Sequence, residues 1–492
     1  MRSTFIIKPL VTAVAALSVA SVASAAGLDR SGQDISAFLQ DGTYAETVYT
    51  YIDADVTGHD LNADGSKGKK IKDIAEDYDF FRYGVKTDID DTFSIGVLYD
   101  EPWGAAADYH GDNSFVGSPT DVVGDLRGSI QQYEAGEVAL GRLQGAQAQF
   151  DQAMSGGASE SQINALIASN DELVAAGIKN YNQLTQTVAG TKQQLEANKP
   201  SYERVKALDE AGILDKALAN TEATKVEVRS ESLTALMGMK FGQNKEFQIY
   251  GGPVAQRLKA NVKLRGDAYD LATGYNLNVN PDTDYGWVAG LQYSKPEIAL
   301  KAALTYRSEI DHSVTAQESM LLAGAEGTQK MKVTTPESVN FDFQTGINPT
   351  TLATAKVRWV PWSDFAITPP LYNESTKARF PNGLDLVSYD DDQWQVELGL
   401  AKRVADNLAV SGTVGWDSGA GNPVTSLGPI EGYYSVGLGA KYDITKNWAV
   451  SAGGKYLMFG DAKGQIPSGD IVSKFEDNDG FALGVKLSYQ DK

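Results

Sequence analysis

The sequence, 492 residues long, lacks cysteine and is short of positive charge. Without cysteine it has no disulfide, no thiolate metal ligand and no cysteine nucleophile. Its formal net charge is −21, because 64 acidic side chains stand against 43 basic ones. A surface this acidic repels phosphate backbones, so nucleic acid is excluded as a partner.

Long apolar runs are also missing, apart from the amino terminus. Residues 1–25 carry two basic residues, then an apolar stretch, then the small residues Ala23-Ser24-Ala25. This is the pattern of a secretory signal peptide, and we expect the mature chain to start at Ala26. Nothing later approaches the roughly 20 apolar residues of a spanning helix. The exported chain is therefore either soluble or a membrane β-barrel.

What the sequence does contain is an alternation with a period of two. In residues 392–416, apolar side chains from Trp394 to Leu400 alternate with polar or small ones, and after a turn the alternation resumes up to Trp416. A hairpin of this kind has one apolar and one polar face. Aromatic residues recur at the ends of the apolar faces, as in the two aromatic girdles of a membrane barrel. We therefore predict that the apolar face contacts lipid and the polar face lines a lumen.

The same alternation predicts fourteen strands. They lie near 45–56, 79–88, 92–101, 228–241, 246–263, 284–295, 298–312, 337–347, 351–368, 391–403, 407–417, 431–443, 447–460 and 478–490. An even number places both termini on the periplasmic side, with short turns there and long loops outside. The predicted fold is all-β: a 14-stranded antiparallel transmembrane β-barrel, which would cross the outer membrane of a Gram-negative cell many times.

One connection breaks this alternation. In residues 103–227, apolar residues recur at spacings of three, four or seven, from Ile130 to Met154 and again from Leu166 to Leu195. Ser155-Gly156-Gly157 separates the two runs. The spacings predict a helical hairpin or coiled coil. Its composition, poor in aromatics and rich in Ala, Gln and Gly, favours an extracellular stalk over a catalytic domain, and makes it a candidate to contact an extracellular partner.

Several segments resemble a known family. VLYDEPWGA at 97–105, ESLTALMGMKFGQNKEFQIYGG at 231–252 and AKVRWVPWSDF at 355–365 resemble the FadL-type outer-membrane transporters of long-chain fatty acids and hydrocarbons. The mature start AGLDRSGQDISAFLQDGTYAE resembles the entrance of that family's hatch. The resemblance implies an N-terminal hatch that plugs the lumen, an apolar capture groove among the outer loops, and a kinked strand through which ligand leaves sideways into the bilayer.

With the hatch included, the sequence predicts five parts. They are a signal peptide (1–25), a hatch (26–44), barrel strands 1–3 (45–102), an extracellular helical insertion (103–227) and barrel strands 4–14 (228–492).

Apolar ligand contacts are predicted in the hatch and at the rim of the barrel. The candidates are Leu28, Ile35, Phe38 and Leu39 in the hatch, and Trp103 at the extracellular end of the third strand. The alternative is that these residues only anchor the plug and the rim.

Contacts with the carboxylate of a fatty acid are predicted from the alternation of side chains along the strands. Arg82, Arg307 and Arg358 occupy positions whose side chains point into the lumen. Arginine suits paired hydrogen bonds with the carboxylate of a fatty acid. The alternative is that each arginine pairs with a carboxylate of the lumen, for which Glu397 and Asp342 are candidates.

The lateral exit is predicted where proline and glycine interrupt a strand. Proline cannot donate a hydrogen bond to its neighbour, and glycine permits a bulge. Glu101-Pro102 ends the third strand, and Gly251-Gly252-Pro253 lies inside the fifth, at mid-strand. The second position is the preferred candidate, because it falls at membrane depth.

Catalytic and metal sites are not predicted. DLNADG at 60–65 matches the first half of an EF-hand loop, but the twelfth position holds Ile71 instead of glutamate. There is no convincing pair of nucleophile and base, so we predict no enzyme, no metal and no cofactor. The predicted function is passive transport of fatty acids or hydrocarbons, with outer-membrane lipid and lipopolysaccharide as surroundings. A non-specific porin and a surface-interaction or adhesion protein are the alternatives.

Overall fold

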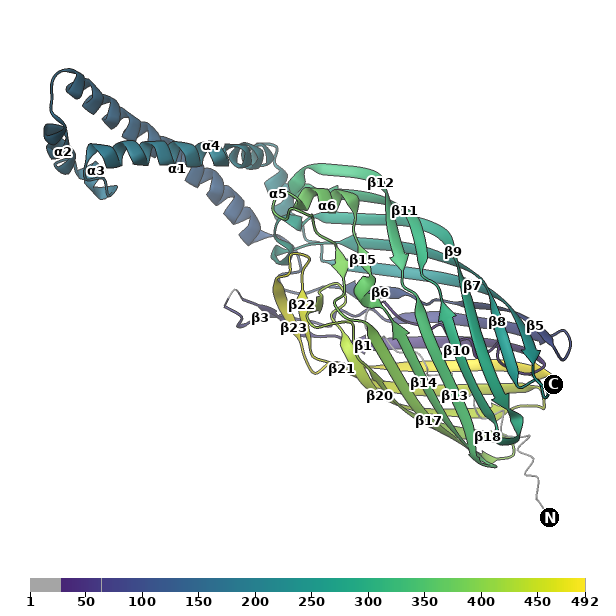
Figure 1. Ribbon diagram of the computed structural model, residues 1–492. Coiled ribbons are helices and arrows are strands. Elements are labelled where there is room, and N and C mark those ends of the chain that lie inside the picture. Colours follow the sequence, from purple (N-terminus) through teal and green to yellow (C-terminus); the bar gives the residue numbers. More distant parts are fainter. Residues whose placement is uncertain (1–27, 63, 492) are drawn as a thin grey trace, which may run out of the picture. The chain divides into compact units, whose positions relative to one another are not determined.

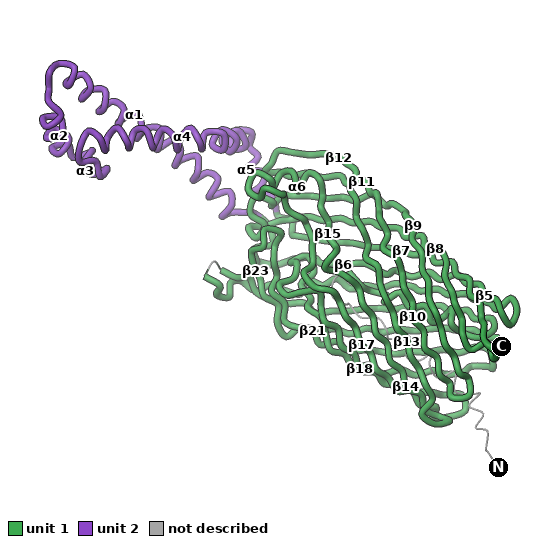
Figure 2. Tube along the Cα trace, in the orientation of Figure 1, with its two compact units in different colours: residues 1–117, 221–492 green, residues 118–220 purple. Residues whose placement is uncertain are grey.

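The computed structural model describes residues 28–62 and 64–491. The predicted signal peptide and the start at Ala26 lie outside the described residues. The chain forms two compact units, shown in different colours in Figure 2. The first unit contains the described residues up to Gly117 and those from Thr221 onward, and the second unit is Ser118–Asn220.

The first unit is a closed antiparallel barrel of fourteen strands, as predicted (Figure 1). Strands that are adjacent in sequence pair with each other, and β1 closes the barrel against β24. The barrel strands are β1 (Thr43–Asp55), β4 (Tyr78–Asp88), β5 (Phe93–Asp100) with β6 (Gly104–Asp108), β7 (Lys225–Phe241), β8 (Phe247–Lys263), β9 (Tyr275–Lys295), β10 (Leu300–Arg307) with β11 (Ile310–Met320), β12 (Ala325–Thr335) with β13 (Ser338–Asn348), β14 (Thr351–Val360), β17 (Gln393–Ala405), β18 (Leu408–Asp417), β20 (Glu431–Asp443), β21 (Trp448–Gly460) and β24 (Asp479–Asp491).

The apolar faces of the strands point outward. Leu398 and Val414, which pair across β17 and β18, are 52% and 54% exposed, whereas Ala401 and Ser411 of the same two strands are buried. An apolar outer surface is stable only in contact with lipid. The predicted orientation of the two faces is therefore correct.

Smaller elements lie in the connections at the long-loop end. A five-stranded sheet contains β2 (Gly58–Leu61), β3 (Lys67–Ile71), β19 (Val424–Thr425), β22 (Ala462–Gln465) and β23 (Ile471–Phe475), and a two-stranded one contains β15 (Ala366–Ile367) and β16 (Val387–Ser388). One α-helix, α6 (Pro370–Thr376), and short 3₁₀ helices at Asp267–Ala272, Pro296–Ile298, Leu321–Ala323 and Trp362–Asp364 complete the first unit.

The second unit is helical. It contains α1 (Thr120–Ser155), α2 (Glu160–Ala168), α3 (Asp171–Ala175), α4 (Tyr181–Glu210) and α5 (Ile213–Leu218). Of the described helices, none combines the length and the apolar character that crossing a membrane requires. The unit is narrower than the predicted insertion 103–227, because β6 prolongs the third strand to Asp108 and β7 begins at Lys225.

The two long helices of this unit pack against each other. Tyr133 of α1 stacks on Tyr202 of α4, with ring centroids 4.0 Å apart. Hydrogen bonds with Tyr202 and Glu134 raise the pKa of Lys206. The predicted helical run ended at Leu195, whereas α4 continues through Pro200 to Glu210, and these contacts lie in that continuation.

The hatch comprises the described residues 28–42 and lies in the lumen. It ends at Gly42, directly before β1, two residues earlier than predicted. Its apolar side chains are buried, including Ile35 and Phe38, which are at most 1% exposed. The hatch therefore fills much of the cross-section of the barrel.

Candidate ligand-binding site

An apolar pocket lies in the long-loop half of the barrel, above the hatch. About 820 Å³ between its walls is free of protein atoms, counting the part open to solvent. Its lining residues are Leu28, Trp103, Ala105, Val226, Val228, Leu258, Ala260, Val262, Leu277, Val279, Met331, Val333, Thr335, Pro336, Trp362, Phe365, Ile367, Leu386, Val387, Tyr389, Thr425, Leu427 and Gly428. None of them is charged. Predominantly apolar walls with few polar groups are typical of a small-molecule site.

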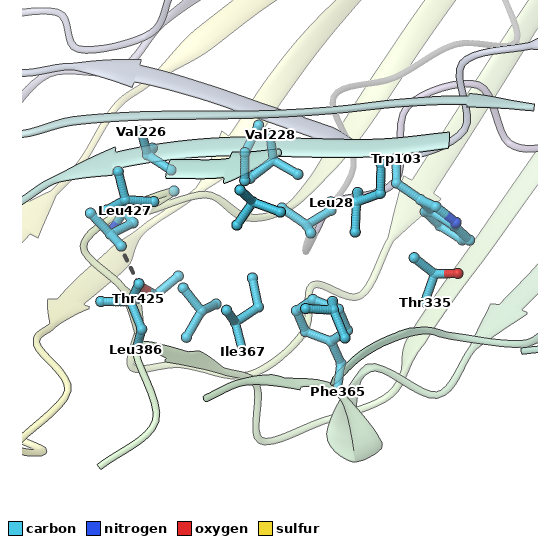
Figure 3. Close-up of a pocket in the computed structure, with 18 of the residues that line it drawn as sticks. Leu28, Trp103, Val226, Val228, Thr335, Phe365, Ile367, Leu386, Thr425 and Leu427 are labelled. Atoms are coloured by element: carbon cyan, nitrogen blue, oxygen red, sulfur yellow. Dashed lines mark hydrogen bonds between the residues drawn. The ribbon is translucent and has the colours of Figure 1, made fainter. Parts of the chain in front are cut away.

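Two sides of the pocket come from different parts of the chain (Figure 3). Val226 and Val228 project from β7 beside Leu28 of the hatch, and face Phe365, Ile367 and Leu386 of the loops. Two of the few polar groups donate within the protein: the Thr335 hydroxyl donates to Gln256 at 2.8 Å, and the Trp362 indole donates to Gln393 at 2.9 Å. The pocket thus offers apolar contact and no charge.

The pocket walls come from the upper ends of strands, where apolar side chains face the lumen and polar side chains face outward. This is the reverse of the pattern lower in the same strands. In the upper part of β7, Val226 and Val228 are buried, whereas Glu227 and Arg229 face outward; lower down, Leu233 faces outward. The upper ends of β8, β9 and β12 show the same inversion. Above the membrane the outer face meets water, so polar residues belong outside and apolar residues can line the interior. Our sequence analysis missed this inversion, although it is legible in the sequence and marks the pocket.

Of the predicted apolar contacts, Leu28 and Trp103 line the pocket. Ile35, Phe38 and Leu39 do not line it. They pack with barrel residues lower in the lumen, and Phe38 lies with its ring centroid 5.9 Å from that of Tyr250. For these three residues, the arrangement corresponds to the alternative, in which apolar side chains of the hatch anchor it to the barrel wall.

The predicted arginines face inward, and two of them bind the hatch. Arg358 donates two hydrogen bonds to Asp29, at 2.5 and 3.2 Å, and Arg82 lies 3.5 Å from Asp34. Arg307 donates to Thr234 at 3.1 Å, and its Nε has no hydrogen-bond partner among the described residues. None of the three lines the apolar pocket.

The lumen carboxylates that were candidates for pairing with arginine lie beside lysines instead. Glu397 accepts a hydrogen bond from Lys455 at 2.5 Å, and Asp342 lies 3.9 Å from Lys356. Further lysines bind the hatch backbone: Lys86 donates to the carbonyl of Gln40, and Lys301 donates to that of Leu39. Arg82, Arg358, Lys86 and Lys301 therefore attach the hatch to the wall, whereas Lys455 pairs within the wall.

The barrel wall is interrupted at the third strand. Pairing between β4 and β5 stops at Tyr83 and Tyr99, although β4 continues to Tyr78. The next link is the bridge between Ala75 and Ala107. In the described part of the chain, no strand pairing joins residues 78–82 to residues 100–106; we call this interruption the wall window.

The hatch closes the wall window. The Arg30 backbone N–H donates to the Pro102 carbonyl and the Gly104 N–H donates to the Leu28 carbonyl, both at 2.8 Å. Residues 28–30 thus replace β4 as the partner of the third strand. The Arg30 guanidinium lies 3.4 Å from the centre of the Tyr78 ring, and a Cβ atom on Gly104 would lie 2.7 Å from Arg30 Nε. Glycine at position 104 permits this close approach.

The second interruption, Gly251-Gly252-Pro253, lies within continuous β8. All three residues pair with β9. On the other side, Gly252 and Pro253 have no partner in β7, and pairing resumes at Val254. The structure has weakened pairing here, on one side of the strand.

Metal binding has little support in the described residues. Asp60 accepts a hydrogen bond from the Ser114 backbone, and Asp64 accepts one from Ser66. Across residues 28–62 and 64–491, no three His, Asp or Glu side chains are grouped to hold a metal ion.

A comparison with family models identifies the chain. The model described as outer membrane protein transport protein (OMPP1/FadL/TodX) matches residues 227–491. The chain belongs to this family. It is therefore an outer-membrane β-barrel, and the predicted resemblance is confirmed. The family is one of transport channels and not a class of enzymes.

Solved structures of the same fold share little sequence with this family member. A FadL homologue of Pseudomonas aeruginosa has a TM-score of 0.59 at 11% identity, covering 96% of this chain and 97% of that one. A TodX deltaS2S3 mutant monoaromatic hydrocarbon channel has a TM-score of 0.52 at 11% identity, covering 97% and 98%. The Pseudomonas putida toluene transporter TodX has a TM-score of 0.50 at 9% identity, covering 96% of each chain. A sequence search among curated proteins finds no match.

Proposed function

We propose that the protein transports hydrophobic compounds, long-chain fatty acids or hydrocarbons, by passive diffusion across the outer membrane. The observation that carries this proposal is the apolar pocket, whose lining residues include no charged side chain. Each methylene group removed from water contributes about 0.8 kcal/mol. Capture therefore needs no energy source. The uncharged lining favours hydrocarbons over fatty acids, since a carboxylate would find no partner there.

The wall window is our candidate for the lateral exit. Leu28 and Trp103 line the pocket, and both belong to the contact that closes the window. A ligand in the pocket therefore touches the segment that must move. Once residues 28–30 detach, the ligand passes between β4 and the third strand towards the lipid. The apolar outer face of the barrel contacts outer-membrane lipid and lipopolysaccharide.

Uptake of labelled toluene and labelled oleate tests the function, in a strain that lacks the protein and carries either the wild-type gene or an empty vector. We expect the protein to accelerate toluene uptake more than oleate uptake. Equal uptake of both compounds with and without the protein would overturn the proposal.

Two single substitutions locate the exit. Arg30→Ala removes the side chain that fills the wall window and should accelerate uptake. Pro253→Val supplies the missing N–H to β7 and should leave uptake unchanged. We substitute Pro253 alone because a Cβ atom on Gly252 would lie 2.0 Å from the Ala235 carbonyl oxygen. Loss of uptake in assembled Pro253→Val, with no effect of Arg30→Ala, would place the exit at Gly251-Gly252-Pro253.

A further inference from the structure

The inner faces of β13, β14 and β17 carry polar side chains in register, which we call the polar ladder. Its middle row is Asp342, Lys356 and Glu397, which are directly paired across the three strands. The row towards the loops is Asn340, Arg358 and Gln395, and the row towards the periplasmic turns is Gln344, Thr354 and Gly399. Three adjacent strands thus present a polar surface to the lumen.

Two cavities lie between the polar ladder and the hatch, beside direct contacts such as the hydrogen bond from Asn340 to the Gly32 carbonyl at 2.8 Å. The upper one, with about 450 Å³ free of protein atoms when the part open to solvent is counted, is bordered on the hatch side by Ser31, Gly32 and Asp34. The lower one, with about 750 Å³ counted in the same way, is bordered on the hatch side by Ser36, Leu39 and Gln40. Asp342, Lys356 and Glu397 line both cavities. The middle row of the ladder therefore forms part of the wall of both cavities, which together we call the polar space.

Charged side chains inside this space remain accessible to water. The side chains of Lys356 and Asp342 are 29% and 31% exposed, although both point into the lumen. Removing a charge from water costs several kcal/mol unless close partners replace the water. Lys356 has Asp34 of the hatch at 3.3 Å, but Asp342 is 3.9 Å from it. The middle row is therefore suited to contact with water, while Leu39, Tyr44 and Ala303 add apolar surface to the lower cavity.

The lower end of this space lies at the periplasmic turns. Lys301 lines the lower cavity and donates to the Leu39 carbonyl at 2.9 Å. Gln344 lines it as well and donates at 3.1 Å to the carbonyl of Ala299, in the turn between β9 and β10.

The upper end is closed by one ion pair. Arg358 lines the upper cavity and holds Asp29, and their side chains are 5% and 2% exposed. The Arg358 guanidinium also lies 5.5 Å from the centre of a Trp103 ring. Trp103 lines the apolar pocket. The Asp29–Arg358 pair thus separates the polar space from the apolar pocket.

We propose that the barrel contains a second, polar passage beside the hatch, which admits water and small inorganic ions from the periplasm and is closed towards the outside by the Asp29–Arg358 pair. This passage is separate from the lateral route of the apolar ligand. Its lining carries both signs of charge, with Lys356 and Lys455 near Asp342 and Glu397. It therefore discriminates little between small cations and small anions.

The conductance of the purified full-length protein in planar bilayers of KCl solution tests this passage. The double variant Asp29→Ala/Arg358→Ala removes the closing pair without leaving one charge unpaired, and should conduct several-fold more than the wild type. In a KCl gradient, its reversal potential should stay near zero. A double variant that assembles and conducts no more than the wild type would overturn the proposal.

A blocking residue and a matched control locate the current. Adding Thr354→Trp to the double variant fills the lower cavity and should abolish the gain in conductance. Adding Ala355→Trp places the same bulk on the lipid side of β14 and should preserve it. A gain that Thr354→Trp leaves intact would refute this path. Thr354→Trp alone should leave toluene uptake unchanged, which separates this test from that of the proposed function.

A labelling experiment keeps the proposal testable if the double variant does not assemble. The chain has no cysteine, so Thr354→Cys in the wild-type background is a unique thiol. A charged, water-soluble methanethiosulfonate added from the periplasmic side should label it, and should not label Ala355→Cys. Failure to label Thr354→Cys in the assembled barrel would overturn the proposal.

Discussion

Val228→Asp places a carboxyl group in the middle of the apolar pocket. Val228 is 4% exposed and projects from β7 beside Leu28 (Figure 3). Since none of the lining residues carries a charge, the new carboxyl has no cation to pair with. Introducing a polar group without a partner costs roughly 1–3 kcal/mol by protein mutational data. A hydrocarbon that covers this group prevents water from compensating, so this cost opposes binding.

The expected loss of affinity is large enough to measure. A cost of 1–3 kcal/mol corresponds to a loss of about 5- to 150-fold. The loss depends on pH, because an apolar surrounding raises the pKa of a carboxyl group. At low pH the introduced group is neutral and the cost is smaller. As the pH rises through the raised pKa, the group ionises and the affinity falls further.

Calorimetric titration of the purified variant with a water-soluble hydrocarbon, at acidic and alkaline pH, measures both effects. Val228→Ile is the matched control, since it retains the apolar surface and should bind about as the wild type does. Assembly is checked by heat-modifiable migration on gels. Wild-type affinity in an assembled Val228→Asp protein at alkaline pH would refute the assignment of this pocket as the capture site.

Three further outcomes follow from the fold and the pocket. Leu398→Arg places a charge against lipid at mid-height and should lower the stability of the barrel by roughly 2–4 kcal/mol. Thr354→Arg, beside the lower cavity, should lower it much less. Equal losses in urea titrations would show that the two faces are misassigned. Deletion of residues 118–220 should leave the barrel able to assemble, because the Gly117 N–H already donates to the Glu222 carbonyl at 2.8 Å and loop closure depends weakly on length; recovery of this variant only as aggregate would make the helical unit structural. Across a series of n-alkanols, affinity should rise by about fourfold per methylene until the pocket is filled, and a flat series would exclude capture by burial.

The strands could be counted from the sequence because the membrane imposes the alternation that marks each of them. Within the bilayer every outward position must be apolar, so the period of two is regular there and all fourteen strands were found. Above the bilayer this requirement ends. The first part of β9, from Tyr275, was missed because Leu277 and Val279 face inward while the outward positions are polar. The residues of the capture pocket lie in strand ends of this kind, above the bilayer. A search for outward apolar faces therefore did not detect the site.

For charged residues in the lumen, the ion-pair partner was harder to predict than the direction in which the side chain points. Parity places Arg82 and Arg358 inside the barrel, but the partner depends on the path of the hatch, which has little regular structure of its own. The hatch brings Asp29 to Arg358, and Asp34 to Arg82 and Lys356. No local pattern links residue 29 to residue 358.

This pairing bears on which ligand the protein favours. Separating one partner of a buried ion pair costs about 3–5 kcal/mol when the other charge stays buried. A fatty acid whose carboxylate displaced Asp29 from Arg358 would leave Asp29, 2% exposed, without its cation. The new ion pair would replace the old one at no net gain, and the cost of the stranded carboxylate would remain. A hydrocarbon makes no such demand on the hatch. Uncharged ligands therefore have an energetic advantage in the resting protein, and a carboxylate ligand would gain affinity only in a variant such as Asp29→Ala, where Arg358 is left without its acidic partner.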